Sequence, residues 1–136
     1  MTVIAVDFDG TIVTENYPGI GEPIEDAINC INILYDQGYC IIINSCRARE
    51  RQDEMKQWLH DHGVKYCHVN ENCRERVVNY RTDCRKISAD CYIDDKSIYG
   101  IPSWPSMITM IVNKFGYCQV RDCQLKQVTV PEVHCD

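Results

Sequence analysis

Two short runs of apolar residues constrain the fold of this chain more than any other feature of its sequence. One covers Thr2 to Asp7 (TVIAVD) and the other covers Tyr39 to Asn44 (YCIIIN), and each ends in a polar residue. Neither run alternates between polar and apolar residues, which is typical of strands that are covered on both faces of a parallel sheet. Parallel strands need a crossover connection, usually a helix. The sequence therefore predicts a strand, a helix and a second parallel strand at the start of the chain.

The segment between these two runs has the periodicity of an amphipathic helix. Pro23 stands near the expected first turn and Gly38 directly after the expected end, and both are common helix boundary signals. We expect the buried face of this helix to consist of Ala27, Ile28, Ile31, Leu34 and Tyr35.

The rest of the chain continues the alternation of strands and helices. The sequence predicts a helix over Arg49 to His62, a strand over Lys65 to Val69, a short helix over Arg74 to Tyr80, a strand over Asp90 to Ile93 and a last helix over Ser103 to Val112. This pattern predicts the α/β class, with an open, Rossmann-like parallel sheet in a three-layer α/β/α arrangement. Such sheets place their functional sites at the carboxyl ends of the strands.

A chain of 136 residues is the length of one ordinary domain. We expect residues 1–136 to form a single domain whose core covers residues 2–112. The pattern over residues 113–136 is less regular. It fits an edge strand or hairpin through residues 120–130, or a segment that contacts another subunit.

The charge of the chain excludes several classes of function. Lys and Arg number 14 and Asp and Glu number 20, so the formal net charge is −6. This charge argues against a protein that binds nucleic acids in general or a membrane surface. No apolar run approaches the roughly 18 residues of a membrane span, and the first residues lack the features of a signal peptide. We therefore expect a cytoplasmic protein.

The number of cysteines, ten, is high for a chain of this length. A disulfide scaffold is one explanation, but the expected cytoplasmic location and the sufficient length for a core argue against it. Most of these cysteines lie in apolar segments, so we expect buried thiols. A zinc site through Cys67, His68 and Cys73, or through Cys118 and Cys123, stays an alternative, although the spacings are not those of usual zinc sites.

Polar side chains follow three of the predicted strands. Asp7 and Asp9 follow the first strand, Ser45 the second, and Asp94 and Asp95 the fourth. Because the carboxyl ends of parallel strands share one edge of the sheet, we expect these side chains to lie close together. Carboxylates held together repel one another unless a cation or a shared proton offsets the repulsion. Magnesium prefers oxygen ligands of this kind, so the sequence predicts a Mg²⁺ site.

These motifs resemble the haloacid dehalogenase (HAD) superfamily. The stretch DFDGTI at Asp7 to Ile12 resembles its first motif, and IIINS, ending in Ser45, resembles the second. Lys86 in RKISAD resembles the basic third motif, and YIDD, ending in Asp94 and Asp95, resembles the fourth. More narrowly, NSCRARE followed by a helix, NEN at residues 70–72, and RKISADCYIDD resemble small bacterial and phage members that are predicted phosphatases. The resemblance covers about residues 2–97 and implies a HAD-like fold.

The resemblance also implies a role for each acidic residue. Asp7 would be the nucleophile that forms an aspartyl phosphate, and Asp9 would be the general acid and base. The Asp7 carboxylate, the Asp9 main-chain carbonyl and Asp94 would bind Mg²⁺, with Asp95 acting through a water. The expected activity is therefore hydrolysis of a phosphomonoester.

Basic and hydroxyl groups are the expected ligands of the phosphoryl group. The resemblance implies this role for Ser45 and Lys86, although Arg85 is adjacent to Lys86 and could replace it. Arg47 and Arg49 bind another phosphate or begin a helix, and the sequence leaves both open. Ser45 could also serve only in a turn. The local basic excess is a solvated face or a substrate patch and comprises Arg74, Arg76, Arg81, Arg85 and Lys86.

The segments between the motifs are too short for the cap domain that many family members use to select substrates. Residues 13–38 hold one loop and one helix, and residues 67–86 hold about one short helix. The resemblance therefore implies a capless member whose substrate is a phosphorylated small molecule, such as a nucleotide or sugar phosphate, or a polynucleotide end. A homo-oligomer in which a neighbour closes the site is a further expectation. Two alternatives are a phosphotransferase with the same intermediate and a non-catalytic module that binds metal or phosphate.

Overall fold

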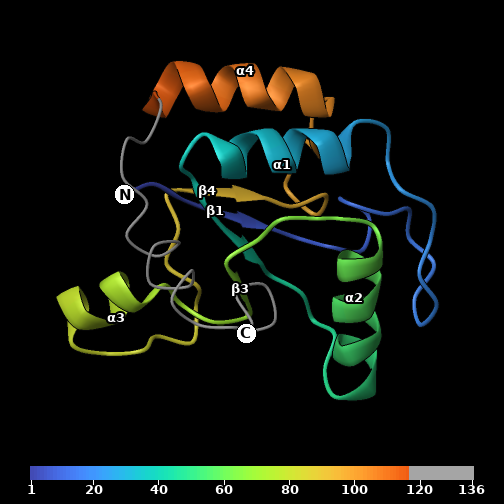
Figure 1. Ribbon diagram of the computed structural model, residues 1–136, viewed down its shortest axis with the longest axis horizontal. Helices are drawn as coiled ribbons and strands as arrows, with labels where there is room; N and C mark the ends of the chain where they lie inside the picture. The colour runs from blue at the N-terminus through green and yellow to red at the C-terminus, as the bar shows by residue number, and fades with distance from the viewer. Residues whose placement is uncertain (117–136) are drawn as a thin grey trace.

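The computed structural model describes residues 1–116. In this part of the chain a parallel sheet of four strands has the order β3-β2-β1-β4 (Figure 1). The strands are β1 (Val3–Val6), β2 (Cys40–Ile43), β3 (His68–Val69) and β4 (Cys91–Ile93). Every residue of β1 and β2 is buried, as expected for apolar runs covered on both faces. The predicted α/β class and parallel sheet are confirmed.

The helices of the described residues all lie where the sequence predicts helices. They are α1 (Ala27–Asp36), α2 (Glu50–Asp61), α3 (Arg74–Tyr80) and α4 (Trp104–Phe115). Helices α1 and α4 lie side by side, and α1 also packs against β2 (Figure 1). The start of α4 follows from Ser103, whose side chain accepts a hydrogen bond from the Ser106 N–H at 3.4 Å.

Some predicted boundaries are wrong. Pro23 does not stand in the first turn of α1, because it forms an isolated antiparallel bridge with Val13 ahead of the helix. Strand β3 is shorter than expected, since only His68 and Val69 pair with β2. Helix α4 continues to Phe115, beyond the expected end at Val112. The expected hairpin through residues 120–130 lies outside the described residues.

The core contains four of the cysteines, as the apolar character of their segments predicts. Cys30, Cys40, Cys67 and Cys73 are buried in the hydrophobic cluster. Cys30 also corrects the predicted face of α1, because it is buried whereas Ile28 is only partly buried.

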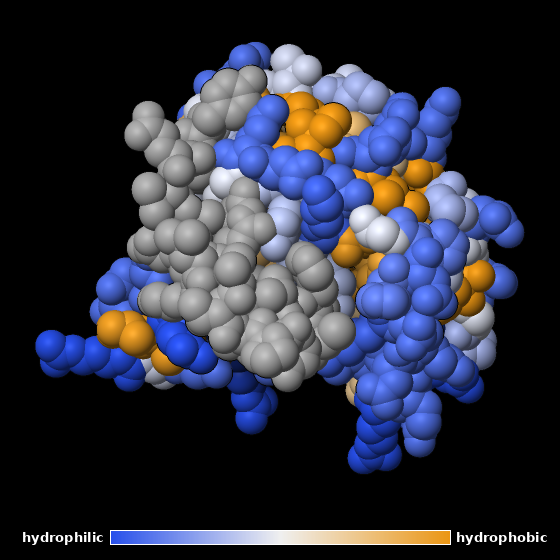
Figure 2. Space-filling view, viewed as in Figure 1, coloured by the Kyte–Doolittle hydropathy of each residue, from blue (hydrophilic) through white to orange (hydrophobic). Residues whose placement is uncertain are grey.

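Hydrophilic residues dominate the surface seen in Figure 2, with smaller hydrophobic areas between them. Within residues 1–116, the most exposed large apolar residues are Ile98 and Tyr99, at 93% and 96% exposure, in the loop that follows β4. None of the helices within residues 1–116 is both long and apolar enough to cross a membrane.

Candidate active site

The carboxyl ends of β1 and β4 bring the predicted acidic residues together. The register pairs Val6 with Ile93, and the Asp7 N–H continues the pairing by donating to the Ile93 carbonyl at 2.9 Å. The residues that follow, Asp7 on one strand and Asp94 on the other, are therefore neighbours. This is also the point where the strand order reverses, because β2 and β4 lie on opposite sides of β1. Open α/β sheets bind their ligands at such a point.

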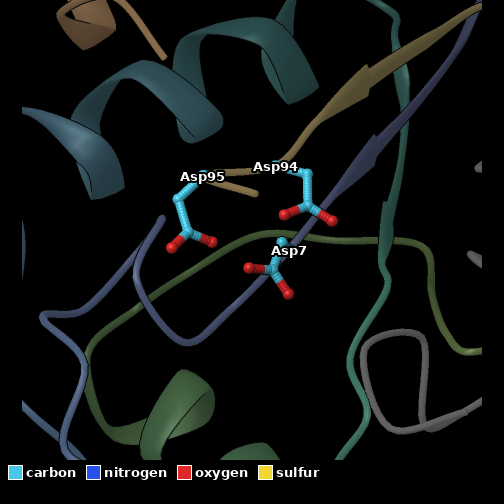
Figure 3. A group of neighbouring side chains, drawn as sticks. All are labelled: Asp7, Asp94 and Asp95. Carbon is cyan, nitrogen blue, oxygen red and sulfur yellow. The ribbon is translucent and has the colours of Figure 1, made fainter. Parts of the chain in front are cut away.

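Asp7, Asp94 and Asp95 form an acidic cluster. One carboxylate oxygen from each lies within 4.8 Å of the other two, and within residues 1–116 this is the one such group of potential metal ligands. Figure 3 shows the three carboxyl groups pointing toward a common space, Asp7 from the end of β1 and the other two from the end of β4. The structure thus brings together three of the four predicted metal-binding acids through their side chains. Cys67, His68 and Cys73, the alternative zinc ligands, do not form such a group. Cys118 and Cys123 lie outside the described residues.

Gly10 permits Asp95 to approach the backbone closely. Its φ angle is +85°, and a Cβ at this position would lie 2.2 Å from Asp95 Oδ2. Any larger residue would therefore be strained and would collide with the carboxylate.

Thr11 connects the two sides of the acidic cluster. Its hydroxyl accepts a hydrogen bond from the Asp95 N–H at 3.0 Å and lies within donating distance of Asp7 Oδ2 (3.2 Å) and Asp95 Oδ1 (3.4 Å). Thr11 is fully buried, and the Trp104 indole N–H donates to its carbonyl at 3.0 Å. Helix α4 therefore fixes the loop that carries Asp7.

The surroundings of Asp7 favour the neutral form of its carboxyl group. They raise its pKa from 3.8 to about 8. Burial is the largest cause, followed by the hydrogen bond with Asp95 and then by the charges of Asp94 and Asp95. Lys96 Nζ lies 3.7 Å from Asp95 Oδ2, but its side chain is 77% exposed and offsets little of this repulsion.

This donor set fits a hard divalent cation. Three carboxylates without a buried basic partner at the cluster supply the oxygen ligands and the negative charge that Mg²⁺ prefers. A bound cation would also remove the repulsion that raises the pKa of Asp7.

Asp9 lies apart from this cluster in a bidentate ion pair with Arg47. Arg47 Nε donates to Asp9 Oδ2 and Nη2 donates to Asp9 Oδ1, both at 2.8 Å. The Arg47 side chain is only 1% exposed, and the Asp9 side chain is 15% exposed. The hydrogen bonds to Asp9 raise the pKa of Arg47 above its usual value. Arg47 therefore contacts an acidic residue of the site, where the sequence left phosphate binding or a helix start open.

Arg47 also holds the loop between β1 and α1. Its Nη1 donates to the Pro18 carbonyl at 3.2 Å and its Nη2 to the Gly19 carbonyl at 2.6 Å. The guanidinium carbon lies 5.0 Å from the centre of the Tyr17 ring and 5.5 Å from that of Phe8. One buried cation thus joins Asp9 to the loop.

Ser45 and Lys86 differ in how the structure uses them. Ser45 lies at the end of β2, where its Oγ accepts a hydrogen bond from the Arg47 N–H at 3.0 Å. The hydroxyl hydrogen is not used in this contact. Lys86 is exposed, and its Nζ lies 5.0 Å from the centre of the Tyr92 ring.

The remaining basic residues singled out in the sequence belong mostly to the surface. Arg49 directly precedes α2, which fits the expected helix start. Arg76 pairs with Asp90 at 2.6 Å. Exposed side chains belong to Arg74, Arg81 and Arg85.

A pocket of about 440 Å³ lies over these acids, and it is lined by Asp7, Asp9, Glu15, Tyr17, Cys46, Asp94 and Lys96. Its volume is within the ~300–1,000 Å³ range of small-molecule sites. Glu15, Tyr17 and Lys96 are not among the site residues predicted from the sequence. Lys96 could have been found from its place directly after the acid pair. Glu15 and Tyr17 reach the pocket because their loop folds back, which no local pattern indicates.

Comparisons with known proteins give a match among solved structures. No protein-family model matches the chain, and no curated protein matches it. Among solved structures, the chain is similar to a conserved protein coded by a locus of Bacteroides thetaiotaomicron, with 38% sequence identity and a TM-score of 0.75. The match covers 82% of this chain and 90% of the other. At this identity and coverage, the chain belongs to the same family as the conserved Bacteroides protein.

Proposed function

We propose that the protein is a Mg²⁺-dependent phosphomonoester hydrolase of the HAD type, with the three-layer α/β/α architecture of that superfamily. The observation that carries the proposal is the convergence of Asp7, Asp94 and Asp95 in one acidic cluster, of which Asp7 and Asp94 line the pocket. These residues belong to the motifs DFDGT and YIDD, which are distant in the sequence and adjacent in space. Such a cluster is suited to holding a cation beside a nucleophilic carboxylate.

The proposed reaction has two displacements. A carboxylate oxygen of Asp7 forms a bond to phosphorus while the bond from phosphorus to the ester oxygen breaks, and the leaving oxygen takes a proton from Asp9. Water then attacks the aspartyl phosphate, Asp9 accepts a proton from this water, and inorganic phosphate leaves as Asp7 is regenerated. A Mg²⁺ ion would reduce the repulsion between the anionic nucleophile and the anionic substrate. Its ligands would be Asp7, Asp94, Asp95 and the main-chain carbonyl of Asp9.

Arg47 affects the part that Asp9 plays. Both Asp9 oxygens accept hydrogen bonds from Arg47, and an ionised carboxylate is stabilised by such a pair. Each oxygen keeps a further lone pair, so Asp9 can accept a proton from water in this arrangement. Donation to the leaving group requires protonated Asp9, and the pair with Arg47 must then loosen.

The phosphoryl oxygens need donors at the pocket. Ser45 keeps a hydroxyl hydrogen for this purpose, and Lys96 lines the pocket directly. The role of Lys86 stays a prediction from the resemblance. We add Lys96 as a candidate because its ammonium group lies beside the acidic cluster.

The hydrolysis of p-nitrophenyl phosphate with Mg²⁺ tests this function. We expect turnover in the wild type, loss of turnover with a chelator, and loss in Asp7→Asn. Asp53→Asn is a matched control, because Asp53 is an exposed acid on α2 outside the pocket. Full activity of Asp7→Asn would contradict the proposed nucleophile.

The arrangement of Arg47 and Asp9 also serves a second candidate, a phosphotransferase. In this reaction the hydroxyl group of an acceptor molecule replaces water in the second displacement and passes its proton to Asp9, whose oxygens each keep a lone pair beside Arg47. Rapid-quench measurement of the phosphorylated protein, with and without added alcohols, separates the two functions. A phosphotransferase should release inorganic phosphate without an alcohol and form the alkyl phosphate in its place when an alcohol is added. That result would favour transfer.

A further inference from the structure

Tyr17 presents an aromatic surface to the pocket that contains the acidic cluster. Its side chain is 58% exposed and lines the same pocket as Asp7 and Asp94. The Arg47 guanidinium lies over the ring, 5.0 Å from its centre, while Arg47 itself is buried. The protein therefore covers part of the ring and leaves the rest open to a ligand.

The loop that carries Tyr17 is held at several points. The Thr14 N–H donates to the Glu22 carbonyl at 2.8 Å, which closes the loop at its base. The Tyr17 N–H donates to Glu15 Oε2 at 3.2 Å, and the next two carbonyls, of Pro18 and Gly19, accept from Arg47. A ring held in this way loses little conformational freedom when a ligand stacks on it.

The charges around the pocket limit the anionic groups that it can accept. Among the described residues, four acids line the pocket, Asp7, Asp9, Glu15 and Asp94, together with one exposed cation, Lys96. A cation at the acidic cluster would offset the charge of one phosphoryl group. A second phosphate or a carboxylate on the same ligand would meet Glu15 without compensation.

We propose that this pocket selects phosphomonoesters with one phosphate group and a planar aromatic ring in the leaving group, as in nucleoside monophosphates, with the ring stacked on Tyr17. The proposal rests on the proposed hydrolase function and names its substrate class. The volume of about 440 Å³ leaves room for a ring beside the phosphoryl group. Every base has a flat aromatic face that can stack on an aromatic side chain. Stacking therefore selects for an aromatic ring and does not distinguish one base from another.

Adenosine 5′-monophosphate and ribose 5-phosphate form a matched substrate pair, because they share the ester oxygen and differ in the base. We expect kcat/KM to be about tenfold higher or more for the nucleotide. Tyr17→Ala should remove this preference by lowering kcat/KM for the nucleotide alone, and Tyr17→Phe should keep it. Tyr80→Ala is the matched control, because Tyr80 is 59% exposed and lies on α3, outside the pocket. Equal loss for both substrates in Tyr17→Ala would overturn the proposal.

A binding measurement separates this proposal from the proposed function. Calorimetry with Mg²⁺ compares both compounds on the wild type and on Tyr17→Ala, whether or not either compound is hydrolysed. Tighter binding of the nucleotide that is lost in Tyr17→Ala supports stacking. If neither compound is hydrolysed, only the hydrolase function is rejected. Hydrolysis of both compounds with equal binding rejects only stacking.

The limit of one phosphate has its own test. Glu15→Gln should improve the binding of adenosine 3′,5′-bisphosphate relative to that of the monophosphate. An unchanged ratio of the two affinities would contradict this limit.

Discussion

Arg47 donates a hydrogen bond of 2.8 Å to each carboxylate oxygen of Asp9, although the two residues are 38 positions apart in the chain. The pair lies at the carboxyl ends of two neighbouring strands, because Asp9 follows β1 and Arg47 follows β2. A buried ion pair of this kind adds little net stability over a well-packed apolar pair, but the loss of one partner leaves an uncompensated charge. Arg47 therefore fixes the orientation of Asp9 and of the loop at Pro18 and Gly19.

Removal of Arg47 should destabilise the protein strongly. Arg47→Ala leaves Asp9 and two loop carbonyls without their donor, and we expect a loss of about 3–5 kcal/mol in the free energy of unfolding. Arg47→Lys keeps the charge but not the fork of donors, so its loss should be smaller. Urea unfolding measures both variants. A double-mutant cycle with Asp9→Ala tests the coupling, and effects that add within about 0.5 kcal/mol would show that the two side chains are independent.

The stability of the metal-free protein should fall as the pH rises. The folded structure raises the pKa of Asp7 from 3.8 to about 8, so it favours the protonated carboxyl group. The resulting stabilisation is complete below pH about 4 and is lost as the pH rises through about 8. The side chain at position 7 stays neutral in Asp7→Asn. The free energy of unfolding of this variant should therefore increase relative to that of the wild type as the pH rises through this range. Urea unfolding with a chelator at a series of pH values measures the difference, and Mg²⁺ should reduce it. Parallel curves for the two proteins would contradict the raised pKa.

Gly10→Ala should damage the acidic cluster as well as the backbone. The added Cβ would lie 2.2 Å from Asp95 Oδ2 at a φ of +85°. Gly63→Ala is a matched control, because Gly63 has a φ of +67° and a Cβ there would meet nothing within 4 Å. We expect both variants to lose about 1 kcal/mol from backbone strain, and Gly10→Ala alone to weaken Mg²⁺ binding. Calorimetric titration with Mg²⁺ gives the answer, and equal affinities in the two variants would show that Asp95 does not matter for the metal.

Alkylation of Cys46 should block the pocket. Cys46 is exposed and lines the pocket, whereas Cys84 is exposed elsewhere. Iodoacetamide should therefore inhibit the proposed phosphatase activity in the wild type and in Cys84→Ser, and Cys46→Ser should resist. The inhibition rate, followed with mass spectrometry of the modified thiol, measures this effect. Inhibition of Cys46→Ser at the wild-type rate would place the sensitive thiol outside the pocket.

Local patterns predicted most of the fold. The apolar runs that became β1 and β2 were found because a strand buried on both faces needs uninterrupted apolar residues, and helix α3 was found with its exact bounds. Boundaries failed where a residue found a distant partner, as Pro23 did with Val13.

The sequence by itself determined which acids stand at the ends of the strands, because that depends only on the position of each acid after an apolar run. The sequence alone therefore predicts that Asp7, Asp94 and Asp95 lie in one cluster, as they do. Only the tertiary structure decided which groups face one another there. In the folded chain Arg47 pairs with Asp9, Lys86 lies over the Tyr92 ring, and Tyr17 lines the pocket. The direction of a long side chain and the path of a loop depend on contacts between residues distant in sequence, so neither follows from local periodicity.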